Sequence, residues 1–252
     1  MQTLLTISYD GTAYAGWQRQ QNAIAVQQKL EEALSTLMNQ PITTKAASRT
    51  DAGVHALGQR AVFSVENLLI PLGKLPQVLS GYLPPDISIT AATAVPASFN
   101  PRFDAAYKTY TYNFYNAPTP NPLLRRYSAF IPRPLNTTAM QKAAKSFIGK
   151  HDFAAFQATG SSAKTTTREI YACAISKHQS QPNLITLTIT GNAFLYNMVR
   201  IIAGTLLYVG LNKIPADTIP AIIQSRNRTK AGKTMPPEGL TLVEVGYTNY
   251  MP

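Results

Sequence analysis

The sequence has 252 residues, 45% of them hydrophobic, which is enough for one large or two modest folded domains and excludes wholesale disorder. Lys and Arg total 23 against 12 Asp and Glu, and the resulting net charge of +11 indicates a polyanionic partner, most simply nucleic acid. The single cysteine, Cys173, excludes an intrachain disulfide and a two-cysteine metal motif, which favours a reducing compartment such as the cytoplasm.

In the first hundred residues, the spacing of apolar side chains predicts three strands and one helix. Residues 5–9 alternate into an Asp-Gly turn, which is typical of an opening strand, and the N-terminus has no signal-peptide pattern. Apolar residues recur at helical spacing over 26–38 and predict an amphipathic helix. Two short β-like runs follow, at 61–65 and 87–94.

The remainder of the chain mixes strands and helices without strict βαβ alternation, so we expect an α+β fold with a largely antiparallel sheet. Strands are predicted at 107–115, 184–190 and 240–245, and helices at 140–148, from Phe194 onward, and at 219–223. The segment 159–167, rich in Gly, Ser, Lys and Thr, is predicted to be a mobile loop.

The most apolar run, 194–211, approaches membrane-spanning length but contains Asn197 and Arg200. A buried core helix is therefore the better interpretation, and no membrane association is expected.

Few side chains are available for catalysis. The three histidines show no metal-ligand spacing, and neither a P-loop nor a dinucleotide fingerprint is present, so we expect no metal and no cofactor. A serine nucleophile stays open, although no serine lies in a recognisable strand-to-helix elbow.

Residues 47–56 place Arg49, Asp51 and His55 around an Ala-Gly pair between two regular elements. Judged by local composition, a simple turn explains the segment, because Asp commonly precedes Gly in turns.

Arg200 favours a functional interpretation of Asp51 over a simple turn. In the middle of a helix that is apolar on most of its circumference, a guanidinium needs a partner, since breaking a buried ion pair costs about 3–5 kcal/mol. Surface snorkelling of the Arg200 stem is the alternative. Acidic residues are scarce and Asp51 lies in a loop, so we predict an Asp51–Arg200 ion pair that holds the carboxylate ionised and aimed, as a nucleophile requires.

A strand over 107–115 would place Lys108, Tyr110, Tyr112 and Phe114 on one face. Aromatic rings beside a cation suit base stacking and phosphate contact. The simpler alternative is that these tyrosines line the core of a sheet.

Together these segments resemble the tRNA pseudouridine synthase A (TruA-type) family. The resemblance extends over nearly the whole chain in the family's order, and its Arg-Thr-Asp-Ala-Gly-Val-His block is highly specific. It rests on YDGTAYAGWQRQ (9–20), SRTDAGVHALGQ (48–59), LPPDI (83–87), FNPRFDAAYKTYTY (99–112), HDFAAF (151–156), FLYNMVRIIAGTLLYVG (194–210) and PPEGLTLVEVGY (236–247).

The resemblance implies a role for five residues. Asp51 is similar to the family's catalytic aspartate, and Arg49 to a residue that contacts RNA or helps to open the target base. Tyr110 would stack on the target uracil, Arg200 would pair with the aspartate, and Leu240 would form an apolar wall of the uracil pocket.

The family fold implies two α/β halves, here 1–104 with the Asp51 loop and 105–252 with the Tyr110 strand and the Arg200 helix. Their mainly antiparallel sheets would meet at a central basic cleft. The implied enzyme is a homodimer that isomerises uridine to pseudouridine at positions 38 to 40 of the tRNA anticodon arm, without a cofactor.

Two departures and two alternatives accompany the resemblance. Ser48 stands where Gly is usual, and Ala25 replaces a common Thr, which removes a helix N-cap worth about 1 kcal/mol.

A catalytically silent RNA-binding or folding-assisting protein stays open, although the set of Asp51, Tyr110 and Arg200 argues against it. An RNA hydrolase or nuclease would need a metal cluster or paired histidines, and neither is evident.

Overall fold

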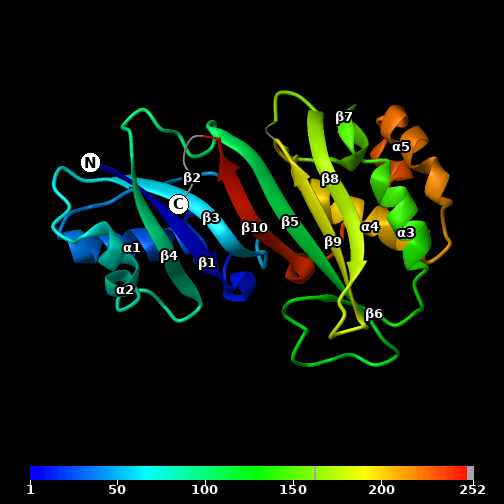
Figure 1. The fold of residues 1–252 in the computed structure, drawn as a ribbon, viewed down its shortest axis with the longest axis horizontal. Coiled ribbons are helices and arrows are strands. Elements are labelled where there is room, and N and C mark those ends of the chain that lie inside the picture. The colour runs from blue at the N-terminus through cyan, green and yellow to red at the C-terminus, as the bar shows by residue number, and fades with distance from the viewer. Residues whose placement is uncertain (162, 249–252) are drawn as a thin grey trace. The chain divides into compact units, whose positions relative to one another are not determined.

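The computed structural model describes residues 1–161 and 163–248 (Figure 1). Ser162, part of the predicted loop at 159–167, lies outside the described residues. The chain groups into two compact units, one comprising Met1–Ala106 with the strand that continues from Thr241, the other Tyr107–Leu240. The predicted division was 1–104 and 105–252; in this grouping the first unit ends at Ala106, and most of the last strand belongs to it.

The first unit contains an antiparallel sheet to which one parallel strand is added. The strand order is β4-β1-β3-β10, and β2 also pairs with β3. Strand β1 is antiparallel to both neighbours, whereas β10 runs parallel to β3, with Thr241 opposite His55. Helix α2 packs against β4 and α1 (Figure 1). The bounds are β1 Gln2–Tyr9, η1 Gly11–Ala13, α1 Val26–Met38, β2 Lys45–Ala46, β3 His55–Ser64, η2 Leu72–Lys74, α2 Leu75–Leu79, β4 Ile87–Val95 and β10 Leu240–Tyr247.

The second unit has the strand order β5-β9-β8-β7, antiparallel throughout, with the short β6 parallel to β5. Helix α3 packs against β8 and α4, and α5 contacts β7 (Figure 1). The bounds are β5 Ala105–Asn116, β6 Ala129–Ile131, α3 Thr137–Lys145, β7 Gly149–Asp152, η3 Ala154–Phe156, β8 Thr167–Lys177, β9 Leu184–Gly191, α4 Met198–Gly210, η4 Ala216–Thr218, α5 Ile219–Ser225, η5 Arg228–Lys230 and η6 Pro237–Gly239.

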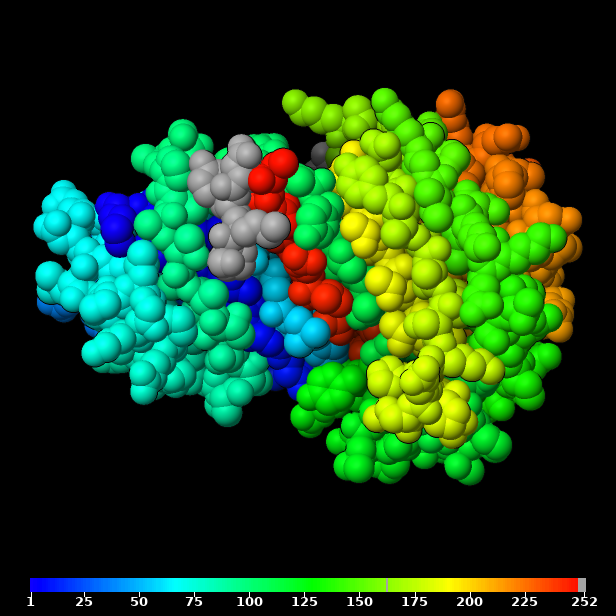
Figure 2. Space-filling view, viewed as in Figure 1, coloured from blue at the N-terminus to red at the C-terminus, as the bar shows by residue number. Residues whose placement is uncertain are grey.

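These units confirm the predicted α+β class with mainly antiparallel sheets. Strand β8 was not predicted, because its buried residues Ile170, Cys173 and Ile175 do not alternate strictly. A shift in its pairing with β9 between Ile170 and Ala172 interrupts the period of two. Its exposed side chains form part of the molecular surface seen in Figure 2.

Helix α4 is shorter than the predicted helix from Phe194. It begins at Met198, because Asn197 has left-handed backbone angles (φ 59°), which Asn tolerates better than most residues. Its residues from Met198 to Gly210 are nearly all buried, so the interpretation as a core helix is confirmed. Among the residues the structure describes, no helix is long and apolar enough to cross a membrane.

Candidate active site

Asp51 lies in a tight turn that leads into β3. The Val54 amide donates to the Asp51 carbonyl at 3.1 Å and closes the turn. The neighbouring Thr50 is buried, with its hydroxyl 2.7 Å from the Tyr9 hydroxyl. Asp51 is half-buried, whereas Arg49, two residues earlier in the same segment, is exposed and accessible to a large substrate.

The segment 9–20 supports the backbone of this turn. The Trp17 amide donates to the Thr50 carbonyl at 3.1 Å, and the Gly53 amide donates to the Tyr14 carbonyl at 3.2 Å. Gly16 has a φ of +90°, and a Cβ on it would lie 2.5 Å from the Thr50 carbonyl oxygen. Only glycine allows this approach, so Gly16 sets how closely the segment packs beneath Asp51.

The same segment also caps α1. The Val26 amide donates to the Gly16 carbonyl at 3.2 Å, and the Gln27 amide to the Trp17 carbonyl at 2.9 Å. Ala25 at the N-cap makes no side-chain bond. Backbone carbonyls therefore satisfy two of the amides that a helix start leaves open, and these contacts replace the bond that the missing Thr would have made.

Residues 83–87 hold the segment 9–20 from another side. The Asp10 amide donates to the Asp86 carbonyl at 3.0 Å, and the Tyr14 hydroxyl donates to the Asp86 carboxylate at 2.5 Å. Burial, with the Asp86 hydrogen bond and charge, raises the pKa of Tyr14 well above its usual value, so Tyr14 stays a neutral donor. Hydrogen bonds thus link three segments that carry the family resemblance, one of which contains Asp51.

His55 joins the first residue of β3 to the turn after β1. Its Nδ1 lies 3.0 Å from the Gly11 amide and 3.2 Å from an Asp10 carboxylate oxygen. The neutral ring accepts the Gly11 hydrogen at Nδ1, whereas a protonated ring would donate to Asp10 instead. Either state ties the end of the Asp51 turn to Asp10 and Gly11.

Arg200 lies in the first turn of α4, not in the middle of a helix as predicted, and it is half-buried. A cation at this end opposes the helix dipole, so its position depends on specific acceptors. Its Nε donates to the Met235 carbonyl at 2.7 Å and its Nη1 to the Asn197 side-chain oxygen at 2.6 Å. The guanidinium is thereby fixed in orientation.

Strand β5 shows the predicted alternation, because Tyr110, Tyr112 and Phe114 are buried on one face. Tyr110 is 7% exposed and meets the Phe194 ring edge to face, with centroids 5.1 Å apart. Tyr112 donates its hydroxyl to the Pro236 carbonyl at 2.9 Å. Burial, with the nearby Glu238 charge, raises the pKa of Tyr112 far above its usual value, so this donor stays neutral.

Within the segment 232–240, only Leu240 was predicted from the sequence to belong to the site, yet the earlier residues also contact candidate residues. It packs closely on α4, because a Cβ on Gly204 would lie 1.8 Å from the Lys233 carbonyl oxygen. The Met235 and Pro236 carbonyls accept from Arg200 and Tyr112, and buried Leu240 follows. No periodic pattern signals the packing of this segment on α4, although a glycine inside an apolar helix is a cue to a close approach.

The structure therefore places the five predicted residues in two groups. Asp51 and Arg49 lie in one turn of the first unit, whereas Arg200, Tyr110 and Leu240 belong to the second. The predicted Asp51–Arg200 ion pair stays a prediction. Within 1–161 and 163–248, no cluster of three or more His, Cys, Asp or Glu side chains could hold a metal ion.

Comparisons with known proteins give one family. A family model described as tRNA pseudouridine synthase matches residues 5–104 and 143–248. Two relatives named tRNA pseudouridine synthase A are each 47% identical: that of Ruminiclostridium cellulolyticum over 96% of this chain and 98% of its own length, and that of Caldicellulosiruptor bescii over 97% and 98%. A chain in the crystal structure of a Cbf5-Nop10-Gar1 complex matches with a TM-score of 0.39 and 11% identity, over 96% of this chain and 49% of that one.

Proposed function

The chain belongs to the tRNA pseudouridine synthase family, and from this premise we propose that it isomerises uridine to pseudouridine in the anticodon arm of tRNA, at one or more of positions 38 to 40. The observation that carries the proposal is 47% identity over almost the whole length of two relatives named tRNA pseudouridine synthase A. The net charge of +11 supports a polyanionic substrate. The retained Asp51, Tyr110 and Arg200 argue against the alternative of a catalytically silent RNA-binding protein.

In the proposed mechanism Asp51 is the catalytic group. The bond between uracil N1 and ribose C1′ breaks, the base rotates, and a bond from C5 to C1′ forms while C5 loses a proton and N1 gains one. Asp51 would either attack the base or sugar or abstract a proton from a ribose carbon, and both roles need an ionised carboxylate. The product has the mass of the substrate, so no redox cofactor is consumed.

The substrate would be bound by residues from both units. The target nucleotide would flip from the stack, with Tyr110 on one face of uracil and Leu240 as an apolar wall. Arg49, exposed beside Asp51, would contact the RNA. Arg200, fixed by Met235 and Asn197, would pair with Asp51.

The direct test of function uses tRNA transcripts carrying tritium at uridine C5. Because the new bond forms at C5, turnover would release tritium, and mapping of the product would show pseudouridine within positions 38 to 40. Absence of release under conditions where the tRNA is bound would contradict the proposed activity and favour the silent binding protein.

We further propose that the protein is cytoplasmic and forms a homodimer. Light scattering tests the homodimer and should give twice the chain mass.

Substitutions at Tyr110 test the stacking role. Tyr110→Phe should stay within about threefold of wild type in kcat/KM, whereas Tyr110→Ala should lose about tenfold or more, since one base–aromatic stack contributes about 1–3 kcal/mol. Tritium release at a temperature where each variant is folded measures both. Tyr115→Ala, a half-buried position on the opposite face of β5, serves as the control. Equal activity of the Phe and Ala variants would contradict a stacking role.

Replacing Arg200 tests its proposed pairing with Asp51. Arg200→Gln should lower kcat by about 30-fold or more, because truncating a charge pair costs roughly 2–5 kcal/mol, and added guanidinium ion should restore part of the loss. Arg228→Gln is a matched control, since Arg228 is also half-buried and bonds the Gly232 carbonyl at 2.8 Å and the Thr234 hydroxyl at 3.2 Å. Unchanged kcat in Arg200→Gln would exclude the pairing.

A further inference from the structure

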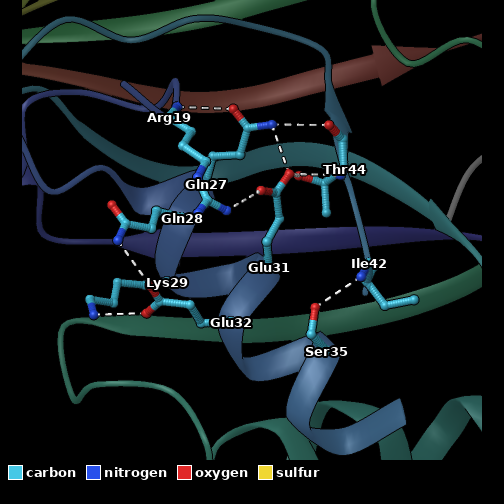
Figure 3. A network of polar contacts seen from close by, with 9 residues as sticks. All are labelled: Arg19, Gln27, Gln28, Lys29, Glu31, Glu32, Ser35, Ile42 and Thr44. Atoms are coloured by element: carbon cyan, nitrogen blue, oxygen red, sulfur yellow. Dashed lines mark hydrogen bonds and ion pairs between the residues drawn. The ribbon is translucent and has the colours of Figure 1, made fainter. Parts of the chain in front are cut away.

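Glu31 is a buried carboxylate whose two oxygens have different kinds of partner. It lies on α1 and is 5% exposed. Its Oε1 accepts three hydrogen bonds, from the Thr44 amide at 2.9 Å, the Thr44 hydroxyl at 3.1 Å and the Gln27 side-chain amide at 3.0 Å (Figure 3). Its Oε2 faces Arg19 Nη1 at 3.3 Å. The Arg19 guanidinium therefore compensates the charge on Oε2, the second oxygen of this buried anion.

Arg19 is held at both of its ends. Its backbone amide donates to the Gln27 side-chain oxygen at 3.1 Å, and Gln27 is itself fixed by donating to the Thr44 carbonyl at 3.0 Å (Figure 3). Its guanidinium is held by Glu31. The conformational freedom that a surface arginine normally loses on binding a ligand is thus already reduced.

The two partners differ greatly in exposure, because the Glu31 side chain is 6% exposed and that of Arg19 is 57% exposed. A guanidinium carries five N–H donors, and Glu31 occupies Nη1. Most donors of Arg19 therefore remain available to a ligand in solvent. A planar, permanently charged fork of donors matches the oxygens of a phosphate group.

The location of Arg19 connects it with the candidate active site. It follows Trp17 by two residues, so their Cα atoms lie at most about 7 Å apart. Trp17 in turn donates to the carbonyl of Thr50, the residue before Asp51. A nucleotide whose ribose reaches Asp51 brings phosphates on both of its sides into this neighbourhood.

We propose that Arg19 binds a backbone phosphate of the RNA close to the target nucleotide, and that Glu31 is the positioning residue that holds its guanidinium. The inference rests on the proposed function for the identity of the RNA, and it adds a phosphate contact and its support to that site.

Salt-dependent binding tests the phosphate contact. The tRNA dissociation constant of wild type and Arg19→Gln is measured at several KCl concentrations. Loss of one phosphate contact should weaken affinity severalfold at low salt and reduce the slope of log K against log salt by about 0.7–0.9. In tritium release, the loss in Arg19→Gln should fall on KM more than on kcat. A slope equal to that of wild type, with only a lower melting temperature, would overturn the proposal.

Lys29→Gln provides the matched control. Lys29 forms a cation–carboxylate pair on α1, the helix that carries Glu31, with its Nζ 2.8 Å from Glu32 Oε2 (Figure 3). This variant removes the same formal charge as Arg19→Gln. If the salt dependence reflects a specific contact of Arg19 with a phosphate, Lys29→Gln should leave the salt slope unchanged. An equal reduction in Lys29→Gln and Arg19→Gln would show a diffuse charge effect and overturn a specific contact.

Glu31→Gln tests the positioning role, because its amide oxygen keeps the place of Oε1 while the charge that holds Arg19 is lost. Affinity should fall, and the double variant with Arg19→Gln should bind no more weakly than Arg19→Gln alone. A rise in affinity, as expected if Glu31 merely repels RNA, would overturn this role. Tritium release by the wild type is scored separately, so an inactive wild type would contradict the proposed function without altering the binding result.

Discussion

Asp51→Asn is expected to lower pseudouridine formation by on the order of a thousandfold or more while changing tRNA affinity only a few-fold. The amide is nearly the same size as the carboxylate, so the turn closed by the Val54 amide should keep its shape. What is lost is the negative charge, without which the side chain neither attacks the base or sugar nor accepts a ribose proton. Tritium release and equilibrium binding, measured on the same preparation, give the two quantities.

Asp217→Asn is the control for this experiment. Asp217 is exposed in η4, so the same chemical change there should leave turnover at the wild-type level. Substantial pseudouridine formation by the Asp51 variant would exclude Asp51 as the catalytic group. A large loss of tRNA affinity would instead assign Asp51 to substrate binding.

Gly16→Ala is expected to have the second largest effect, although its side chain takes no part in chemistry. The added methyl group would lie 2.5 Å from the Thr50 carbonyl oxygen and 3.0 Å from the Asp51 carbonyl carbon, and both are backbone atoms that cannot rotate away. We expect a loss of about 2–4 kcal/mol in the free energy of unfolding. We also expect kcat/KM to fall about a hundredfold, because a displacement near 1 Å at a catalytic group costs on that order.

Gly160→Ala separates the effect of backbone strain at a positive φ from the effect of the clash of the added methyl group. Gly160 also has a positive φ, +85°, but a Cβ on it would meet nothing within 4 Å. It should therefore show the backbone strain alone, about 1 kcal/mol, with unchanged kcat. Urea unfolding and tritium release measure both variants. If Gly16→Ala behaved like Gly160→Ala, close packing against the Asp51 turn would have no functional importance.

Local patterns in the sequence predicted most of the regular elements. Alternation in β5 and helical spacing in α1 each reflect burial of one face, which a single segment records in its own residues. The start of α4 was misplaced because apolar composition continues through Phe194 and Leu195, whereas the left-handed angles of Asn197 set the boundary. Composition does not encode that single backbone conformation.

The candidate site was predictable only in part for a related reason. Asp51 stood out because its block of residues is chemically unusual. The support from Gly16 and Trp17 was missed, because it consists of backbone contacts between segments more than thirty residues apart, and any residue contributes the same carbonyl and amide groups. Glu31 was likewise unremarkable in an amphipathic helix until its burial and its bonds to Thr44 were known.

The return of β10 to the first unit has a consequence for synthesis on the ribosome. The chain leaves this unit at Ala106 and re-enters it at Thr241. At about 5–20 residues per second, the intervening residues take on the order of ten seconds to be synthesised. During that time the first residues of β3, His55 and Ala56, lack their parallel neighbour β10. An open strand edge is a site for wrong pairing with other nascent chains. Aggregation of this enzyme during expression should therefore begin at β3, and a chain stopped before Thr241 should expose that strand to proteases.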